Sequence, residues 1–360
     1  MLMISQQNSD KLKNKNEINM KISIIAFTDN GMEIANKLSA SLILDDLNDV
    51  SFTRCGKGAL SSWTEEHFSQ SDALVFIGAI GIALRAIAPY IKTKTKDPAV
   101  VVVDELGQFS IPILSGHIGG ANELAMEISE ILDAIPVITT ATDINNVFAI
   151  DTWAKNQGLK ILNPQCIKLV SSKLLKGEAI HIKTDYEIKG NVLKNVYLND
   201  LEDTNNDYDV IISHKINDND KEDILYLIPQ IITVGIGCRK DISFENIEKS
   251  ILNILESESY HILALNSIAS IDKKANEKGI LEFAEKYDLP FNTYSAEELN
   301  SLEGDFTKSE FVKSVVEVDN VCERSAVFES NGELIRRKDT CDGRGVTVAL
   351  AMNDPVISWE

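Results

Sequence analysis

Cationic residues are scarce in this sequence, which has 35 lysines and arginines, 55 aspartates and glutamates, and a net charge of −20. A protein that binds nucleic acid needs a basic surface to neutralise the phosphates, and an anionic membrane surface makes the same demand. The sequence also lacks any apolar run near the ~20 residues that a membrane-spanning helix requires. We therefore expect neither nucleic acid nor a membrane as a partner.

Cysteine is also sparse, with five residues spaced singly along the chain. An odd number without close pairs fits neither a disulfide framework nor a zinc-finger spacing. Reduced thiols of this kind are typical of a cytoplasmic protein. The five positions are Cys55, Cys166, Cys238, Cys322 and Cys341.

The length of 360 residues is too great for one ordinary core, while 44% apolar and 25% charged residues are typical of a globular chain. Strand and helix patterns alternate in two long regions, which predicts an α/β fold. We expect two three-layer α/β domains joined by a smaller, variable middle domain. The predicted divisions are a disordered leader at 1–19, an N-terminal domain at 20–143, a middle domain at 144–228 and a C-terminal domain at 229–360.

The most informative stretch is SGHIGGANELA, residues 115–125. A short apolar strand pattern precedes it and an amphipathic helix pattern follows, so the glycines lie where a strand turns into a helix. Glycine lets a ligand approach the backbone closely, and the N–H groups of a helix N-terminus favour an anion. His117, within this turn, is the best candidate for an acid–base group because its ordinary pKa is near neutral.

A second strand-to-helix turn contains Gly78 and Gly81 and is followed by Arg85. It is a weak dinucleotide fingerprint because it lacks the third glycine, and tight packing of strand against helix explains the glycines equally well. Three lysines, Lys92, Lys94 and Lys96, follow; they are either a solvated face or partners for an anion. Ligands bind at the carboxyl ends of parallel strands, and we expect this turn, the 115–120 turn and the 139–143 turn all to lie at such ends.

The C-terminal region repeats the strand, glycine turn and helix at Gly235, Gly237, Cys238 and Arg239. A thiol at a helix N-terminus beside an arginine is expected to have a lowered pKa, which would suit a nucleophile. Packing in the interior is the alternative. Further along, Asp272, Lys273 and Lys274 lie at the end of another predicted strand.

Several catalytic signatures are missing from the sequence. It contains no phosphate loop of the form G-x-x-x-x-G-K-[ST], no G-x-S-x-G elbow and no H-E-x-x-H zinc motif. The residues alone therefore indicate a multi-domain α/β protein that binds a polyanionic small molecule, and they do not specify a reaction.

The sequence resembles the cobalt-precorrin-5A hydrolases, the cobalamin biosynthesis protein G family. The matching motifs are GAIGIALRAIAP, DPAVVVVDELGQF, LSGHIGGANELA, VGIGCRKD, IASIDKKANEKGILEFA, YSAEELN, SEFVKSVV, VCERSA and GVTVALA. Two positions depart from the family pattern. Lys278 stands where proline is frequent, and Arg337-Lys338 stands where a Pro-Lys pair is typical.

The resemblance implies the hydrolysis of cobalt-precorrin-5A in anaerobic cobalamin biosynthesis. Such an enzyme opens a δ-lactone with water and releases C20 with its methyl group as acetaldehyde, giving cobalt-precorrin-5B. No cofactor is implied, because the substrate carries the cobalt. The implied partners are this anionic cobalt-tetrapyrrole and neighbouring enzymes of the pathway.

On this basis we expect His117 to be the base, with Ser115 and Glu123 as further catalytic candidates. His117 could instead hold the loop by a hydrogen bond or bind the substrate's cobalt. The expected substrate-binding residues are Gly78, Gly81, Arg85, Gly116, Gly119, Gly120, Asn122, Thr140, Gly237, Arg239, Lys240, Asp272 and Lys274. A tetrapyrrole carrier without catalysis is the competing function, and a nucleotide-dependent enzyme is disfavoured by the missing phosphate loop.

Overall fold

The computed structural model describes residues 20–43, 48–93, 96–117, 119–145, 147–199, 208–215 and 223–359. The predicted leader at 1–19 and the side chain of Lys94 therefore lie outside the described residues. The chain divides into two compact units, Met1–Asn146 and Val147–Glu360, and each is described by itself.

The N-terminal unit is built on a six-stranded sheet with the order β2-β1-β3-β4-β5-β6. Its strands are β1 (Lys21–Ala26), β2 (Asp49–Arg54), β3 (Ala73–Ile77), β4 (Ala99–Val103), β5 (Phe109–Leu114) and β6 (Ile135–Pro136). Four of the pairings are parallel, and only β4 and β5 pair in antiparallel fashion. The β4 sequence AVVVV is buried throughout, as expected for a strand covered on both faces.

The antiparallel pairing of β4 and β5 reverses the direction of the last two strands. The carboxyl ends of β5 and β6 therefore lie where β4 begins, and the Ser115 hydroxyl donates to the Asp97 carbonyl there at 2.9 Å. The three N-terminal turns all follow the carboxyl ends of strands, as predicted, but they lie at two opposite edges of the sheet. The Gly78–Gly81 turn lies at the opposite edge, roughly 16 Å away along a five-residue strand.

The reversal has a clear local cause. Only five residues separate β4 from β5, and a parallel crossover needs a dozen or more. Asp104 stabilises the tight turn, because its carboxylate accepts the N–H groups of Leu106, Gln108 and Phe109. This hairpin determines where the His117 turn lies.

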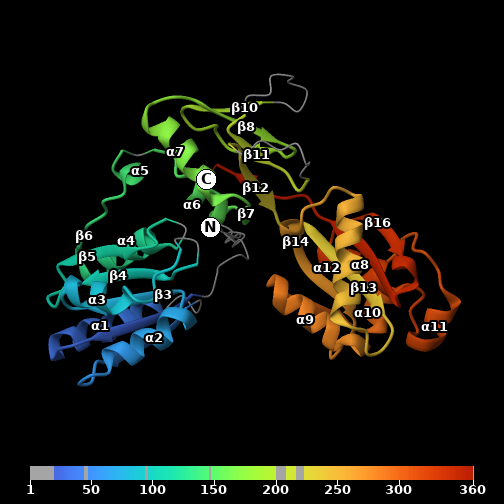
Figure 1. Cartoon of the computed structure of the whole chain (residues 1–360), viewed down its shortest axis with the longest axis horizontal. Helices are drawn as coiled ribbons and strands as arrows, with labels where there is room; N and C mark the ends of the chain where they lie inside the picture. Colours follow the sequence, from blue (N-terminus) through green and yellow to red (C-terminus); the bar gives the residue numbers. More distant parts are fainter. Residues whose placement is uncertain are drawn as a thin grey trace, which may run out of the picture. The chain divides into compact units, whose positions relative to one another are not determined.

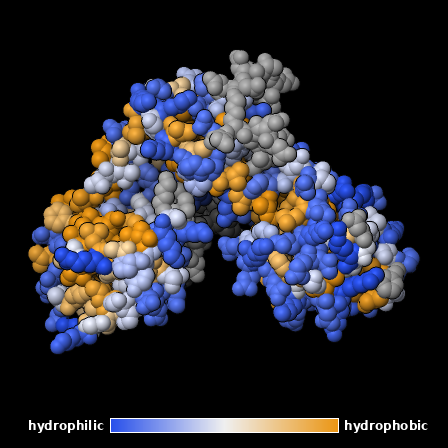
Figure 2. Space-filling view, viewed as in Figure 1, coloured by the Kyte–Doolittle hydropathy of each residue, from blue (hydrophilic) through white to orange (hydrophobic). Residues whose placement is uncertain are grey.

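Helices cover both faces of the N-terminal sheet, giving three layers (Figure 1). Helices α1 (Asp29–Leu42) and α4 (Ala121–Leu132) pack on one face, and α2 (Leu60–Gln70) and α3 (Ile80–Ile87) pack on the other. The short helix α5 (Ala141–Ile144) follows β6. In Figure 2 apolar residues gather on the visible surface of this unit, and its exposed apolar side chains include Ile80, Leu84 and Ile135.

The C-terminal part of the second unit contains a five-stranded sheet with the order β15-β14-β13-β17-β16. The strands are β13 (Ile232–Cys238), β14 (Leu265–Ile271), β15 (Phe291–Tyr294), β16 (Glu333–Asp339) and β17 (Val346–Met352). Strands β13 to β15 run parallel, and β17 pairs with β13 in antiparallel fashion.

Helices again cover both faces of this sheet. Helices α8 (Phe244–Ser257) and α9 (Lys278–Tyr287) pack on one face and α12 (Val321–Ser330) on the other. A Cβ atom at Gly235 would lie 1.8 Å from the Cys322 carbonyl oxygen, so glycine is needed for α12 to pack this closely. The remaining short elements here are α10 (Ala296–Ser301), α11 (Glu310–Val316), η2 (Ile262–Ala264), η3 (Asp272–Lys274) and η4 (Cys341–Gly343).

The middle region of the second unit forms a smaller sheet with the order β10-β8-β11-β12-β7. Its elements are α6 (Ile150–Asn156), β7 (Leu159–Ile161), η1 (Pro164–Cys166), α7 (Ile167–Leu175), β8 (Ile180–Thr184), β10 (Val196–Asn199), β11 (Val210–Ile212) and β12 (Leu225–Pro229). Near the end of the chain β18 (Ile357–Ser358) pairs with β9 (Ile188–Lys189), and Trp359 stacks on Trp153 at 5.1 Å. The end of the chain thus packs on the middle region.

The prediction of an α/β fold is confirmed by the mixed sheets and their covering helices. The predicted domain boundaries stay predictions. Within the described ranges, no helix is long and apolar enough to cross a membrane.

Candidate functional site

The turn between β5 and α4 is held by contacts among its own residues. Ser115 has a positive φ of 56°, and a Cβ atom added at Gly119 would lie 2.3 Å from the Ser115 Cβ. Such a contact is impossible without movement of the backbone. Glycine at 119 is therefore required by the shape of the turn, which fixes the place of His117.

His117 lies against a carboxylate from the next turn. Its Nε2 atom is 2.9 Å from Oδ2 of Asp143 and 3.1 Å from the Thr142 hydroxyl. Both side chains of the pair are partly sheltered, with 17% of His117 and 37% of Asp143 exposed. Because an ionised carboxylate only accepts hydrogen bonds, this contact favours the tautomer that carries its proton on Nε2.

Asn122 supports this pair from the first turn of α4. Its side-chain amide donates to Oδ2 of Asp143 at 2.9 Å and to the Thr140 hydroxyl at 3.0 Å. The predicted residues Asn122 and Thr140 therefore lie together with His117. A base held by a carboxylate, which is held in turn by an amide, is an arrangement suited to proton transfer.

The N–H groups at the start of α4 are used within the turn. Those of Gly120, Ala121 and Asn122 donate to the carbonyls of His117, Ser115 and Gly116 at 2.8 to 3.1 Å. The Gly120 N–H is thus engaged in the structure. The predicted substrate-binding roles of Gly119 and Gly120 stay predictions.

The other predicted residues of the N-terminal unit fall into two groups. Ser115 fastens the turn to the start of β4, and Glu123 is exposed on α4 beside it. Exposed Lys92 and Lys96 flank the same edge, where the Lys92 N–H donates to Asp97. By contrast, Gly78 and Gly81 lie at the opposite edge, and Arg85 donates back to the Gly81 carbonyl at 3.2 Å. The fold does not join these three to the His117 turn.

A second candidate site is a cavity of about 840 Å³ in the C-terminal part of the second unit. It lies at the carboxyl ends of β13 and β14, where ligands bind in sheets of this kind. Five cationic side chains line it, namely Arg239, Lys240, Lys273, Lys274 and Lys338. Apolar side chains of α11 line it as well, namely Val312, Val315 and Val316.

Most of the predicted C-terminal residues line this cavity. Gly237, Arg239, Lys240 and Lys274 belong to its walls. Asp272 has a different place, because its Oδ1 accepts the N–H of Lys273 at 2.7 Å in the turn after β14.

The pKa of the Cys238 thiol differs from the sequence prediction. Burial raises the pKa of this thiol to about 11, although nearby Lys274 acts to lower it. The predicted lowering is therefore wrong, because desolvation outweighs the cation. Lys274 is itself paired with Glu277, at 2.9 Å between Nζ and Oε2, and the Glu277 side chain is buried while that of Lys274 is partly buried. Cys238 is thus protonated at neutral pH and is a poor nucleophile.

Sequence reasoning missed several residues of the two sites. Thr142 and Asp143 follow a predicted strand, and their position at a strand end was the available signal. Lys338 and the α11 valines gave no such signal, because they reach the cavity only through the packing of β16 and α11. The prediction that the protein uses no cofactor of its own stays a prediction.

The fold and the two sites define a multi-domain α/β protein with a histidine–carboxylate pair and a separate cationic cavity. Three family models match it: the cobalamin synthesis G N-terminal model at residues 62–143, the cobalamin biosynthesis central region at 148–229, and the cobalamin synthesis G C-terminus at 232–351.

Full-length relatives agree with these matches. The cobalt-precorrin-5A hydrolase of Salmonella typhimurium is 33% identical, covering 92% of this chain and 97% of the relative. That of Priestia megaterium is 29% identical, covering 92% and 94%. The chain belongs to the cobalamin synthesis G family, whose curated relatives here are named as hydrolases.

Two solved structures are also similar to parts or most of this chain. A cobalamin biosynthesis protein G homologue from Sulfolobus solfataricus is 29% identical, with a TM-score of 0.38 and coverage of 93% of this chain and 98% of that one. CobE, a protein from the cobalamin (vitamin B12) biosynthetic pathway, is 25% identical, with a TM-score of 0.32 and coverage of 35% and 92%.

Proposed function

We propose that this protein is a cobalt-precorrin-5A hydrolase, which opens the δ-lactone of its substrate and releases acetaldehyde. The relatives' names support the substrate, and the contact between His117 and Asp143 carries the chemistry. A lactone is an ester, so its hydrolysis requires a base for water and a donor for the oxyanion. The proposal assigns the first role to His117.

In the proposed reaction Nδ1 of His117 accepts a proton from water while the water oxygen attacks the lactone carbonyl. Asp143 stabilises the imidazolium that forms, because its carboxylate already accepts from Nε2. The lactone opens to a carboxylic acid, which loses its proton to solvent, and a C20 alkoxide. The alkoxide becomes acetaldehyde when the bond from C20 to the ring breaks, and the conjugated macrocycle takes up the electron pair together with the proton that His117 returns. No added cofactor is required.

The C-terminal cavity is the proposed place for the substrate's carboxylates. A tetrapyrrole has apolar faces and an anionic rim, and this cavity combines the α11 valines with cationic Arg239, Lys240 and Lys274. Its volume of about 840 Å³ lies in the usual range of small-molecule sites. At the His117 turn, exposed Lys92 and Lys96 are two of the described cations that a carboxylate could contact.

The test is anaerobic incubation of the protein with cobalt-precorrin-5A, with assay of acetaldehyde and of the product's mass. Catalytic release of acetaldehyde with formation of cobalt-precorrin-5B supports the proposal. Binding without acetaldehyde would instead support a tetrapyrrole carrier, and a requirement for ATP would support a nucleotide-dependent enzyme. A shift of the cobalt absorption bands that is lost in His117→Ala would indicate that the histidine binds cobalt.

A further inference from the structure

Residues 302–319 contribute one wall of the C-terminal cavity. This segment connects the end of α10 to the start of α12. This segment contains α11, whose Val312, Val315 and Val316 line the cavity. Val315 is 58% exposed, so the wall presents apolar surface to the solvent. What fastens the segment therefore determines the shape of the cavity.

A single buried carboxylate fastens two of the walls. Glu323 of α12 has no exposed surface, and it accepts hydrogen bonds from the N–H and hydroxyl of Thr307 at 2.8 and 2.7 Å. The same carboxylate accepts the N–H of Lys338, on β16, at 2.7 Å. Thr307 precedes α11, whereas Lys338 lines the cavity from another element. Glu323 therefore connects the apolar wall to a cationic one.

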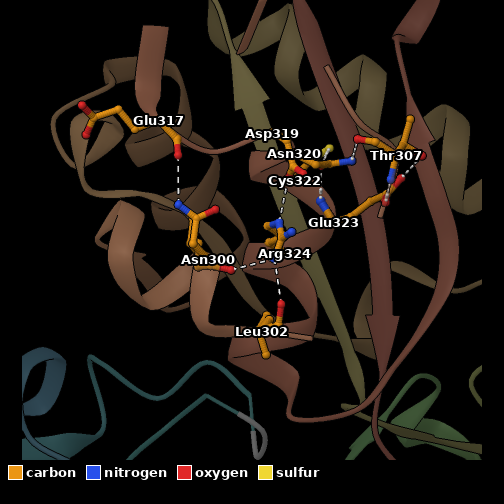
Figure 3. Close-up of polar contacts among 10 residues, drawn as sticks. Asn300, Leu302, Thr307, Glu317, Asp319, Asn320, Cys322, Glu323 and Arg324 are labelled. Atoms are coloured by element: carbon orange, nitrogen blue, oxygen red, sulfur yellow. Dashed lines mark hydrogen bonds and ion pairs between the residues drawn. The ribbon is translucent and has the colours of Figure 1, made fainter. Parts of the chain in front are cut away.

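The neighbouring residues of α12 hold the same segment at other points. The Asn320 side chain donates to the Thr307 carbonyl at 2.8 Å, and its oxygen accepts the N–H of Glu323 (Figure 3). Arg324 donates to Asp319 at 2.8 Å and to the carbonyl of Leu302 at 2.9 Å. Both ends of the segment are thus tied to the first turn of α12.

Glu323 and Thr307 do not themselves line the cavity. The buried Glu323 carboxylate accepts three hydrogen bonds, two from Thr307 and one from Lys338. A buried carboxylate in this state is costly to disturb, because removing one acceptor leaves a buried donor without a partner. Its effect on the cavity must therefore pass through Thr307 and Lys338.

We propose that Glu323 is a positioning residue for substrate binding, which sets the place of the α11 wall relative to Lys338. This inference rests on the proposed function, since it takes the C-terminal cavity as the tetrapyrrole site. It separates two roles within one protein: Glu323 governs binding of the substrate, whereas His117 governs its hydrolysis.

The test compares Glu323→Gln with Glu329→Gln in the full-length protein. Glu329 lies on the same helix and accepts from Asn292 and Tyr294, away from the cavity lining, so it is a matched control. The dissociation constant of cobalt-precorrin-5A is measured anaerobically by absorption titration, and kcat by acetaldehyde release. Thr307→Val removes one donor only and serves as the milder variant.

The proposal predicts at least a fivefold weaker dissociation constant for Glu323→Gln, a smaller change for Thr307→Val, and kcat within twofold of wild type for both. Glu329→Gln should leave both quantities within twofold. Trypsin should also cleave ligand-free Glu323→Gln faster at Lys308 or Lys313. Unchanged affinity in a folded Glu323→Gln protein would overturn the proposal, as would a fall in kcat at unchanged affinity.

The two proposals fail in different ways. If wild-type protein binds the substrate and releases no acetaldehyde, the hydrolase function fails, while the comparison of dissociation constants still decides the role of Glu323. If Glu323→Gln does not fold, Thr307→Val decides it: an affinity equal to that of wild type then overturns the proposal.

Discussion

His117 and Asp143 lie 26 residues apart in the sequence, and their side chains meet at 2.9 Å. The contact exists because β5 and β6 pair in parallel, with Phe109 opposite Ile135, so the turns that follow the two strands lie side by side. Asn122, on the helix that connects these strands, completes the arrangement. The sheet thereby places a base, its carboxylate and a supporting amide at one edge.

Substitution of the pair should impair catalysis and spare binding. We expect His117→Ala to lower kcat about 10²- to 10³-fold, the usual contribution of a general base. Asp143→Asn should lower kcat by a smaller factor, because the imidazole remains but its orientation and charge stabilisation are weakened. Steady-state acetaldehyde release measures both.

His67→Gln is the matched control for these variants. His67 packs against Trp63 at 4.6 Å on α2, and it should be replaceable with kcat within about twofold of wild type. Normal turnover by His117→Ala would show that the histidine only holds the loop.

Gly119→Ala should distort the His117 turn. The new Cβ would meet the Ser115 Cβ at 2.3 Å and the Ser115 carbonyl oxygen at 2.7 Å, so the backbone must move. We expect a loss of about 2 kcal/mol or more in the stability of the N-terminal unit, together with loss of turnover. Thermal unfolding and acetaldehyde release measure these effects.

Gly56→Ala is the comparison for this variant, because its Cβ would meet only the Ala59 Cβ at 3.7 Å. Equal unfolding temperatures for the two variants would contradict the close contact between Ser115 and Gly119.

Arg239→Gln should weaken substrate binding. Arg239 lines the C-terminal cavity and is expected to contact a substrate carboxylate, an interaction worth about 1 kcal/mol when partly exposed. The expected result is an approximately fivefold higher dissociation constant with kcat unchanged. Lys278→Gln removes an exposed charge that pairs with Glu282 on α9, and it should have no effect. Equal dissociation constants for the two variants would show that Arg239 does not contact the substrate and would contradict the assignment of this cavity as the substrate site.

Mild acid should destabilise the second unit through two histidines. Burial lowers the pKa of His214 and of His261, and the His261 N–H donates to the His214 carbonyl. In the folded protein both histidines have a pKa below the value of about 6.5 that is expected in the unfolded chain. Unfolding at a pH below about 6.5 is therefore accompanied by the uptake of protons. Their contribution to stability is complete above about pH 6.5 and is lost as the pH falls.

Urea unfolding at pH 7.5 and 5.5 measures this effect. We expect the free energy of unfolding to be smaller at pH 5.5 than at pH 7.5, because the unfolded chain binds these protons more tightly. His214→Gln keeps an acceptor for the Tyr186 hydroxyl and cannot be protonated, so its decrease should be smaller. The same decrease in both proteins would show that His214 does not contribute.

The parts of the fold that could be predicted from the sequence are the strands and helices whose residues show a clear local pattern of apolar and polar positions. The apolar run AVVVV and the helix after SGHIGG are readable because burial on both faces and helix periodicity leave direct traces. His117, Asn122 and Thr140 could be predicted as site residues because they lie at or next to turns that follow predicted strands. Arg85 does not lie with His117 because strand direction depends on the β4–β5 connection, whose five residues are too few for a parallel crossover. The pKa of Cys238 was mispredicted because burial depends on tertiary packing, which one neighbouring arginine does not reveal.

Hydrolysis of cobalt-precorrin-5A with His117 as the base is tested by the amount of acetaldehyde released per protein molecule under anaerobic conditions, for wild type and for His117→Ala at saturating substrate. We expect many equivalents from wild type and about 10²- to 10³-fold slower release from the variant. Substrate binding without acetaldehyde from wild type, or equal release from both proteins, would contradict it.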